Sequence, residues 1–439
     1  MQTHQTRFFY RITRIILCSY LGAKSGVNML LSKIFTHEFS FDERYRWIAT
    51  SVVVIFAVTY SVSFLGLMQH VAYLGPGLGD DLDFRPYLQV FDIFYQASGG
   101  RWLSGPLLFF SVLTVVNVLF TAGIIIVGYW IYPRTMGKPF PITVLFTYFS
   151  LNAVCTVGIW TIHGLTGLAA PLFGFDILEG VKAFGNLLAD LRVWADQVPT
   201  LVDMPALLAF FVLQMVGGFF HYWFHRLSHE SRLLWLLFHR THHMTPELIQ
   251  PSTQAVFNAF PFFLFAAVPY VIIFSVIGKL ITSESLLVYL IIYKLFSAFA
   301  NLFSHQTALY KWAQGKWYIR ALSTVTSEGV YHYLHHSAEE EHNNERGNLI
   351  NIGGGLFFIW DRVFGTYRPV TEHKPIVGLQ GVKHEDMSTN PLRLAFAGIA
   401  QIVFELKNNK SFKEKALIVM GPSDYIPENS YDYVYKAKL

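Results

Sequence analysis

Long blocks of apolar residues dominate this chain, and they predict helices that cross a membrane. A membrane span needs roughly 20 mostly apolar residues. Six stretches meet that length: Trp47–His70, Pro106–Tyr132, Pro141–His163, Pro205–His225, Ala255–Ile277 and Ser285–Ser304. Pro261 and Pro269 lie inside the fifth stretch and should bend it, so the last two stretches are expected to form a tilted hairpin. The pattern therefore predicts an all-α integral membrane protein with about six membrane helices.

Composition strengthens the membrane interpretation. Of 439 residues, 53% are hydrophobic and only 14% are charged, whereas a soluble domain usually has about a quarter charged residues. The net charge of +4 comes without a Lys/Arg block of the kind that binds nucleic acid, so no nucleic-acid partner is expected. The two cysteines, Cys18 and Cys155, lie far apart in the sequence. Their separation argues against a disulfide framework and against a cysteine-based zinc site.

Charged residues between the apolar stretches predict the orientation in the membrane. The leader over residues 1–46 and the short link Pro133–Phe140 are basic, and basic segments stay on the cytosolic side. The first long loop is acidic, with the carboxylates Asp80, Asp81, Asp83 and Asp92. Both termini and all the dense histidine segments are then expected on the cytosolic face, as a helical cap over the membrane helices.

The same pattern divides the chain into four parts. After the leader come N-terminal membrane helices over residues 47–204 and a histidine-rich domain over residues 205–370. Residues 371–439 are more polar and rich in lysine, which predicts a cytosolic C-terminal tail with a helix around Pro391–Leu406.

Clustered histidines are the candidate chemistry of this sequence. There are 17 histidines, and residues three or four apart on a helix share a face. Imidazoles that converge in this way would repel one another if protonated, so a metal is their natural partner. The histidines form three boxes, which are His221–His225, His239–His243 and His332–His336. Each box should present its ligands on one face, and His229 extends the stripe of the first box. The candidate metal ligands are His221 and His225; His239, His242 and His243; His305; and His332, His335 and His336.

The number of candidate histidine ligands indicates how many metal ions the site binds. A tetrahedral zinc takes four ligands, or three and a water, so these candidates suit two ions better than one. The His-Glu-x-x-His pattern of zinc proteases does not occur in the sequence. Imidazole also suits iron, and ligand type alone leaves iron and zinc open. A membrane zinc hydrolase and a non-catalytic metal-binding or transport protein are therefore the competing interpretations. Histidines at the ends of the spans favour interfacial catalysis over transport.

The boxes and their neighbours resemble the fatty acid hydroxylase/sterol desaturase superfamily of membrane di-iron enzymes, over roughly Pro205–Pro369. The resemblance implies two Fe2+ ions bound by the histidines named above and an O2-dependent hydroxylation or desaturation. This chain departs from the family pattern at Asn351-Ile352-Gly353 and in the acidic insert Glu339–Asn348, which contains His342. The sequence motifs that carry the resemblance are His221-Tyr-Trp-Phe-His225, Phe238-His239-Arg-Thr-His242-His243, His332-Tyr-Leu-His335-His336 and Ile359-Trp360-Asp361-Arg362.

Within that superfamily, two features are similar to the alkylglycerol monooxygenase-like branch. One is His229-Glu230 directly after the first box, and the other is the order of Gly378-Leu, Asn390-Pro391 and Gly421-Pro422 in the tail. That branch implies an ether lipid as substrate and a tetrahydropterin as reductant. Sterol desaturases, sterol methyl oxidases and fatty acid hydroxylases share the same boxes, so a sterol or a fatty acyl chain is the alternative substrate.

The function expected is an O2-dependent lipid hydroxylase or monooxygenase, with a desaturase or sterol methyl oxidase as the alternative on the same scaffold. No His-Pro-Gly-Gly haem motif is present, so electrons should come from a separate donor, either tetrahydropterin or a cytochrome b5/ferredoxin-type protein. Asp361 is expected to support a ligand histidine, and Glu230 to do the same or to contact a pterin. The expected location is the bacterial inner membrane or the endoplasmic reticulum.

Overall fold

The structure is a computed structural model, and it describes nine main segments with isolated residues between them. These segments cover residues 33–40, 125–143, 197–244, 276–284, 303–323, 329–342, 349–353, 359–370 and 373–436. Within the described residues the secondary structure is helical, and β-structure is limited to isolated bridges such as Ser231 with Pro422. Short helices outside the histidine boxes include η3 (Val127–Ile131), α7 (Tyr132–Met136), α14 (Gly278–Ile281), α16 (Thr307–Gln314) and α17 (Trp317–Ser323).

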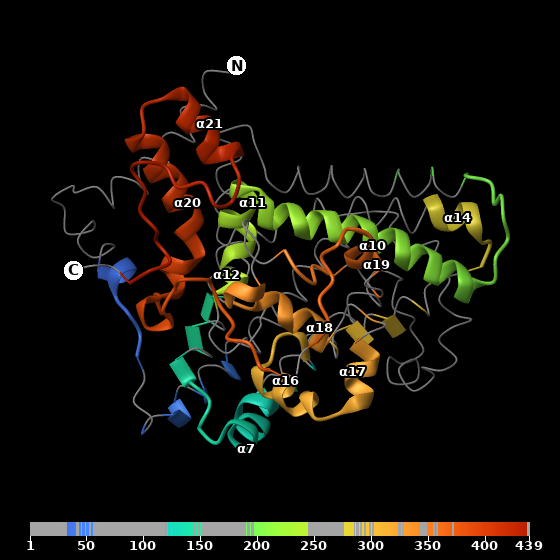
Figure 1. The fold of residues 1–439 in the computed structure, drawn as a ribbon, viewed down its shortest axis with the longest axis horizontal. Helices are drawn as coiled ribbons and strands as arrows, with labels where there is room; N and C mark the ends of the chain where they lie inside the picture. Colours follow the sequence, from blue (N-terminus) through green and yellow to red (C-terminus); the bar gives the residue numbers. More distant parts are fainter. Residues whose placement is uncertain are drawn as a thin grey trace, which may run out of the picture.

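The longest element is α10 (Ala206–Glu230), which runs as one continuous helix across Figure 1. Its 25 residues span about 37 Å at 1.5 Å per residue. It is the one helix among the described residues that is long and apolar enough to cross a membrane. One face is buried, including Ala209, Leu213 and Tyr222, whereas Leu208 and Phe220 on other faces are exposed. The fourth predicted span is thus confirmed as a single apolar helix.

The other five predicted spans lie wholly or largely outside the described residues, so they stay predictions. The stretch Pro106–Tyr132 is described near its end, where η3 continues into α7 past the predicted boundary. Gly137 ends α7 in a left-handed conformation, with φ +70°. Glycine adopts that conformation without the steric penalty of a side chain.

Short, irregular helices carry the two later histidine boxes. Ser231 has an extended backbone and ends α10. The chain then forms α11 (Arg232–Leu234), the π-helix η4 (Trp235–His239) and α12 (Arg240–His243). The third box spans α18 (Val330–Tyr333) and the 3-10 helix η6 (Leu334–His336). Further along are η7 (Glu340–His342), α19 (Ile359–Val363) and η8 (His384–Asp386).

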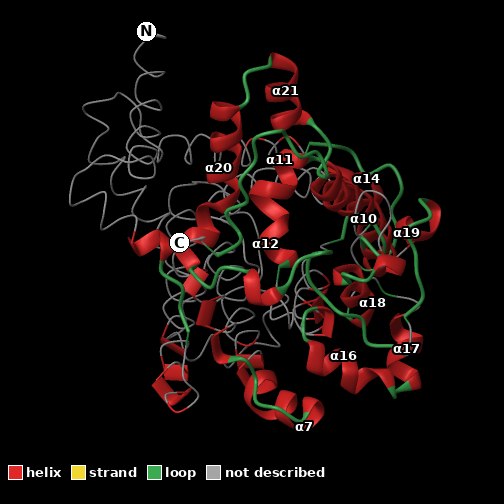
Figure 2. Ribbon diagram, turned by 60° about the vertical axis from the view of Figure 1, so that its left-hand side comes forward, coloured by secondary structure: helices red, strands yellow, loops and turns green. Residues whose placement is uncertain are grey.

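The C-terminal segment packs against the helices of the second box. Its helices are α20 (Pro391–Asn408) and α21 (Phe412–Met420), and the predicted helix around Pro391–Leu406 is thereby confirmed. The Asn390 side chain caps α20 by accepting a hydrogen bond from the backbone N–H of Arg393 at 3.0 Å. Both views place α20 and α21 beside α11 (Figures 1 and 2). Leu236, Ile402 and Ile418 form a buried apolar cluster between these elements.

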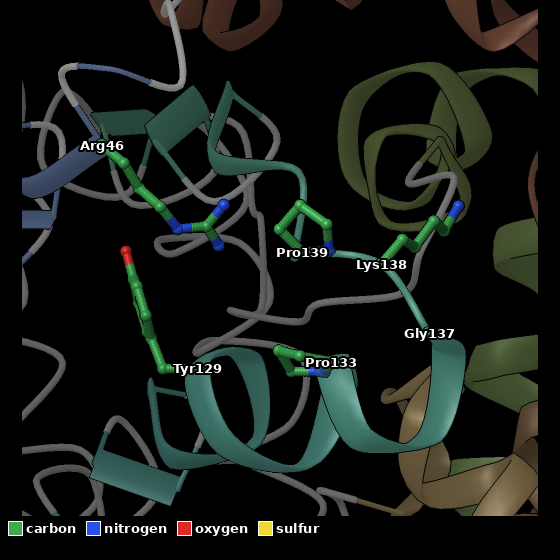
Figure 3. A pocket seen from close by; sticks show the side chains of 6 residues that line it. All are labelled: Arg46, Tyr129, Pro133, Gly137, Lys138 and Pro139. Carbon is green, nitrogen blue, oxygen red and sulfur yellow. The ribbon is translucent and has the colours of Figure 1, made fainter.

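An open pocket of about 380 Å³ lies beside η3 and α7 (Figure 3). The Arg46 side chain lies over the ring of Tyr129, at 5.2 Å from its centroid, and donates to the Phe140 carbonyl at 2.8 Å. No histidine lines this pocket, so its chemistry is separate from that of the boxes. It is lined by Arg46, Tyr129, Pro133, Gly137, Lys138 and Pro139.

Candidate metal centre

Nine histidines form two adjacent clusters, each compact enough to hold one ion. In each cluster, one ring nitrogen from every member lies within 4.8 Å of the others. Their members are buried or half-buried, and they come from segments that are up to about a hundred residues apart in sequence. The first cluster is His225, His229, His239, His243 and His335. The second cluster is His242, His305, His332 and His336.

The second and third boxes each divide their histidines between the two adjacent clusters. His239 and His243 belong to the first cluster, whereas His242 between them belongs to the second. In the third box, His335 joins the first cluster while His332 and His336 join the second. The physical reason is local geometry, because these boxes combine α-helical, π-helical and 3-10 turns instead of one regular helix. The division places two sites side by side, as a dinuclear centre requires.

The imidazoles of the first cluster point their Nε2 atoms inward. The Nε2 atom of His239 lies 3.0 Å from that of His225, 2.8 Å from that of His229 and 3.0 Å from that of His243. The Nε2 atoms of His229 and His335 are 3.0 Å apart. With metal–nitrogen bonds of about 2.0–2.1 Å, ligands at right angles are about 2.9 Å apart and tetrahedral ligands about 3.3 Å apart. Five nitrogens at these separations suit a higher coordination number than that of a structural zinc.

Three consecutive carbonyls orient ligands of both clusters. His335 donates from Nδ1 to the Ile350 carbonyl at 2.8 Å, and His225 donates from Nδ1 to the Ile352 carbonyl at 2.5 Å. The backbone of Asn351, between them, hydrogen-bonds His332. Because a carbonyl only accepts, Nδ1 of His225 and of His335 must carry the proton. Their Nε2 atoms therefore present a lone pair to the cluster, which is the tautomer that binds a metal.

Asp361 holds this row of carbonyls in place. Its side chain is fully buried and accepts from the backbone N–H groups of Ile352 at 2.8 Å and Gly353 at 2.9 Å. The Thr366 hydroxyl donates to the same carboxylate at 2.7 Å. Burial raises the pKa of Asp361, although these hydrogen bonds act in the opposite direction. Asp361 is thus linked to His225 through the backbone of Ile352.

In the second and third boxes, burial lowers the pKa of the histidines and so favours their neutral form. Burial, followed by the neighbouring imidazoles, lowers the pKa of His239, His243, His335 and His336 well below the usual value. Burial likewise lowers the pKa of His332 to about 3. A neutral imidazole is the form that offers a lone pair to a metal. The clusters are therefore prepared to bind cations without first releasing protons.

His336 shows most directly that these residues fit a metal. Its side chain is fully buried, and neither of its ring nitrogens has a hydrogen-bond partner. A buried polar group without a partner costs free energy, and such groups are rare in native proteins. A cation between His336 and the other members of the second cluster would satisfy the inward-facing nitrogen.

Besides Asp361, two sequence-predicted site residues lie outside both clusters. His221 is exposed on α10, one turn before His225, and the two ring centroids are 5.9 Å apart. Glu230 accepts from Arg226 at 3.0 Å, as an ion pair along the helix. The remaining predicted ligands are all brought together.

His229 was not among the predicted ligands, although it lies within the first cluster. Its spacing of four residues from His225 was the signal that could have included it. His342 bonds the Ser337 hydroxyl at 2.8 Å and is not a member of either cluster.

Comparison with known proteins agrees with this geometry. No curated protein and no solved structure matches the chain. Residues 210–366 match the sequence model of the family described as fatty acid hydroxylase. The matched segment begins in α10 and ends at Thr366, so it contains both histidine clusters and Asp361. Family members are oxidoreductases of the lipid hydroxylase or desaturase type. Over these residues the chain is therefore similar in sequence to the fatty acid hydroxylase family, which lies within the fatty acid hydroxylase/sterol desaturase superfamily.

Proposed function

We propose that this protein is an O2-dependent di-iron monooxygenase that hydroxylates a C–H bond of a membrane lipid. The observation that carries the proposal is the pair of adjacent clusters, with five and four histidines whose nitrogens converge. Bound iron would supply the activation of O2 and the oxidation of an unactivated C–H bond. The family supports a lipid-directed oxidase, and the neutral nitrogen donors support iron in place of harder cations.

The chain's own residues would hold and shield this centre. His225 and His335 would bind through Nε2, because their Nδ1 protons are donated to the Ile352 and Ile350 carbonyls. The full burial of His335 and His336 excludes water from the ligand atoms. His225 and His229 lie in the last two turns of the apolar helix α10. That position would place the centre at one membrane face, where a lipid chain can approach from the bilayer and the reductant from water.

The substrate we propose is an ether lipid, a sterol or a fatty acyl chain. We place the centre and both termini on the cytosolic side of a bacterial inner membrane or the endoplasmic reticulum. Electrons would come from a separate donor, which is tetrahydropterin or a cytochrome b5/ferredoxin-type protein.

Comparative lipid mass spectrometry under 18O2 tests the proposal. Membranes with the wild-type protein should contain a lipid that carries one added 18O atom and that is missing from membranes with the His335→Ala variant. A lipid that lacks two hydrogens and carries no label would instead assign a desaturase on the same scaffold. Identical lipid profiles for the two proteins, with a demonstrated electron donor present, would refute both oxidase assignments.

A zinc hydrolase fits the structure less well. Five converging nitrogens in one cluster exceed the four positions that zinc usually fills. A hydrolase product would also contain oxygen from water, so the label from 18O2 separates the two classes.

A further inference from the structure

The C-terminal segment beyond the family domain makes an unusual set of contacts with the second histidine box. The family match ends at residue 366, whereas residues 391–436 form α20, α21 and the chain that follows them. The box segment, residues 231–243, passes between α10 and this part of the tail. It carries two ligands of the first cluster, His239 and His243, and one of the second, His242.

Arg232 anchors the start of the box segment in the tail. Its side chain is 2% exposed and forms an ion pair of 2.7 Å with the fully buried Glu405. The same guanidinium donates to the carbonyls of Tyr425 at 2.8 Å and Ile418 at 2.9 Å. Its backbone N–H donates to the Gly421 carbonyl at 3.0 Å. Each of these partners lies in the tail, so burial of the Arg232 charge depends on that segment.

Arg240 anchors the box itself. This residue directly follows His239 and donates to the Asp432 carboxylate and to the Gln401 side-chain oxygen, each at 3.0 Å. Both acceptors again belong to the tail. Gln401 in turn donates to Glu405 at 3.0 Å, which joins the Arg240 contacts to those of Arg232. A single polar network from α20 therefore holds the segment on both sides of His239.

The backbones of α20 and η4 are in direct contact. A Cβ atom on Gly398 would lie only 2.0 Å from the carbonyl oxygen of Leu236, and 2.7 Å from its carbonyl carbon. No other residue type fits there without moving one backbone away from the other. Since η4 ends at His239, the packing of α20 sets the position of this ligand.

We infer that the C-terminal segment is a positioning element of the metal centre, which fixes the second histidine box through Gly398, Arg232 and Arg240. This inference rests on the proposed metal site. Removing these contacts should displace His239, His242 and His243 while leaving the third box and its carbonyl partners in place. Mutation of the residues that orient metal ligands typically weakens metal binding by roughly 10–100-fold.

The test uses full-length protein in detergent, with variants that change only the tail. Gly398→Ala and the double variant Gln401→Leu/Asp432→Ala are compared with Lys407→Ala, an exposed site on the same helix. The rescue variant is Gln401→Leu/Asp432→Glu. It keeps a carboxylate for Arg240 and should recover the iron binding that the Asp432→Ala change removes. Two readouts are taken, namely bound iron per chain and hydrogen exchange of peptides covering residues 231–244 and 330–336.

The inference predicts weaker iron binding, by roughly 10–100-fold, and faster exchange at 231–244 alone, in the Gly398→Ala and double variants. Lys407→Ala should match the wild type. Should Gly398→Ala fail to accumulate, the double variant and its Asp432→Glu rescue decide the result. Unchanged iron affinity and exchange in that variant would overturn the inference. A wild-type protein without metal would refute the proposed function, and exchange at 231–244 would still decide whether the tail positions the box.

Discussion

At the scale of single residues, the nitrogen that each histidine turns inward determines what the centre can bind. His335 is fully buried. Its Nδ1–H group donates a hydrogen bond to the Ile350 carbonyl, and its Nε2 atom lies beside the Nε2 atom of His229. We predict that His335→Ala abolishes lipid oxidation and releases metal, while the protein still inserts, because α10 is unchanged. Activity, bound metal and membrane fractionation are the measurements. His373→Ala is the matched control, because His373 is exposed and pairs with Glu339. Retained turnover in His335→Ala would remove this residue from the centre.

A substitution at Asp361 tests whether the backbone carbonyls of residues 350–352 orient the histidines. In Asp361→Asn, one carboxylate oxygen becomes an NH2 group that faces the N–H of Ile352 or Gly353. A buried donor left without an acceptor costs about 1–3 kcal/mol, and metal affinity should fall roughly 10–100-fold. Thermal unfolding and metal titration measure the two effects. Asp203→Asn, at an exposed position where the carboxylate accepts from Ser283, should leave metal affinity unchanged. Wild-type metal affinity in Asp361→Asn would show that the row does not orient the ligands.

Buried neutral histidines also predict how stability depends on pH. Their pKa is lowered by burial, to about 3 for His332, whereas an unfolded histidine titrates near 6.5. Between these values the unfolded chain binds more protons than the folded chain, so stability falls as pH drops below about 6.5. The unfolding midpoint of metal-free protein should therefore decrease between pH 7 and pH 5, and less steeply in His336→Leu. Equal slopes in both proteins would contradict the burial of neutral His336.

At the scale of elements, the proposed function requires α10 to contact a bilayer on one face and to contribute histidines to a polar centre near its end. Its exposed face includes Phe220, which is 45% exposed near the middle of the helix. An arginine in the bilayer core costs about 2.5–3.5 kcal/mol. We predict that Phe220→Arg reduces the amount of inserted protein, whereas Phe220→Leu does not. Phe412→Arg, at an 87% exposed site on α21, should be tolerated. Normal insertion of Phe220→Arg, measured by fractionation and detergent extraction, would argue against a lipid-facing α10.

The elements that could be predicted from sequence are those with a strong local signal. The apolar run of α10 and the Asn390-Pro391 start of α20 were such cases, because hydrophobicity and capping act within one segment. The division of the second and third boxes between two clusters could not be predicted, since it depends on the π-helix that ends at His239 and the 3-10 turn at His335. Nor could the partners of Arg232, because they lie about 170–190 residues later in the sequence.

At the scale of the whole molecule, the apolar helix, the histidine domain and the tail contribute different parts of one centre. The helix brings His225 and His229, the third box brings ligands oriented by residues 350–352, and the tail holds the second box. The family domain alone thus supplies every proposed ligand but not every contact that places it. A protein truncated after residue 366 should accordingly bind metal more weakly than the full chain, which metal titration of both would measure.

The most direct test of the central claim is metal analysis of the full-length protein, purified from iron-replete cells without added zinc. Elemental mass spectrometry gives the stoichiometry, and Mössbauer spectroscopy shows whether the iron ions interact. We predict two irons per chain, one for each histidine cluster, with spectra of a coupled pair. One tightly held zinc and no iron would contradict the account.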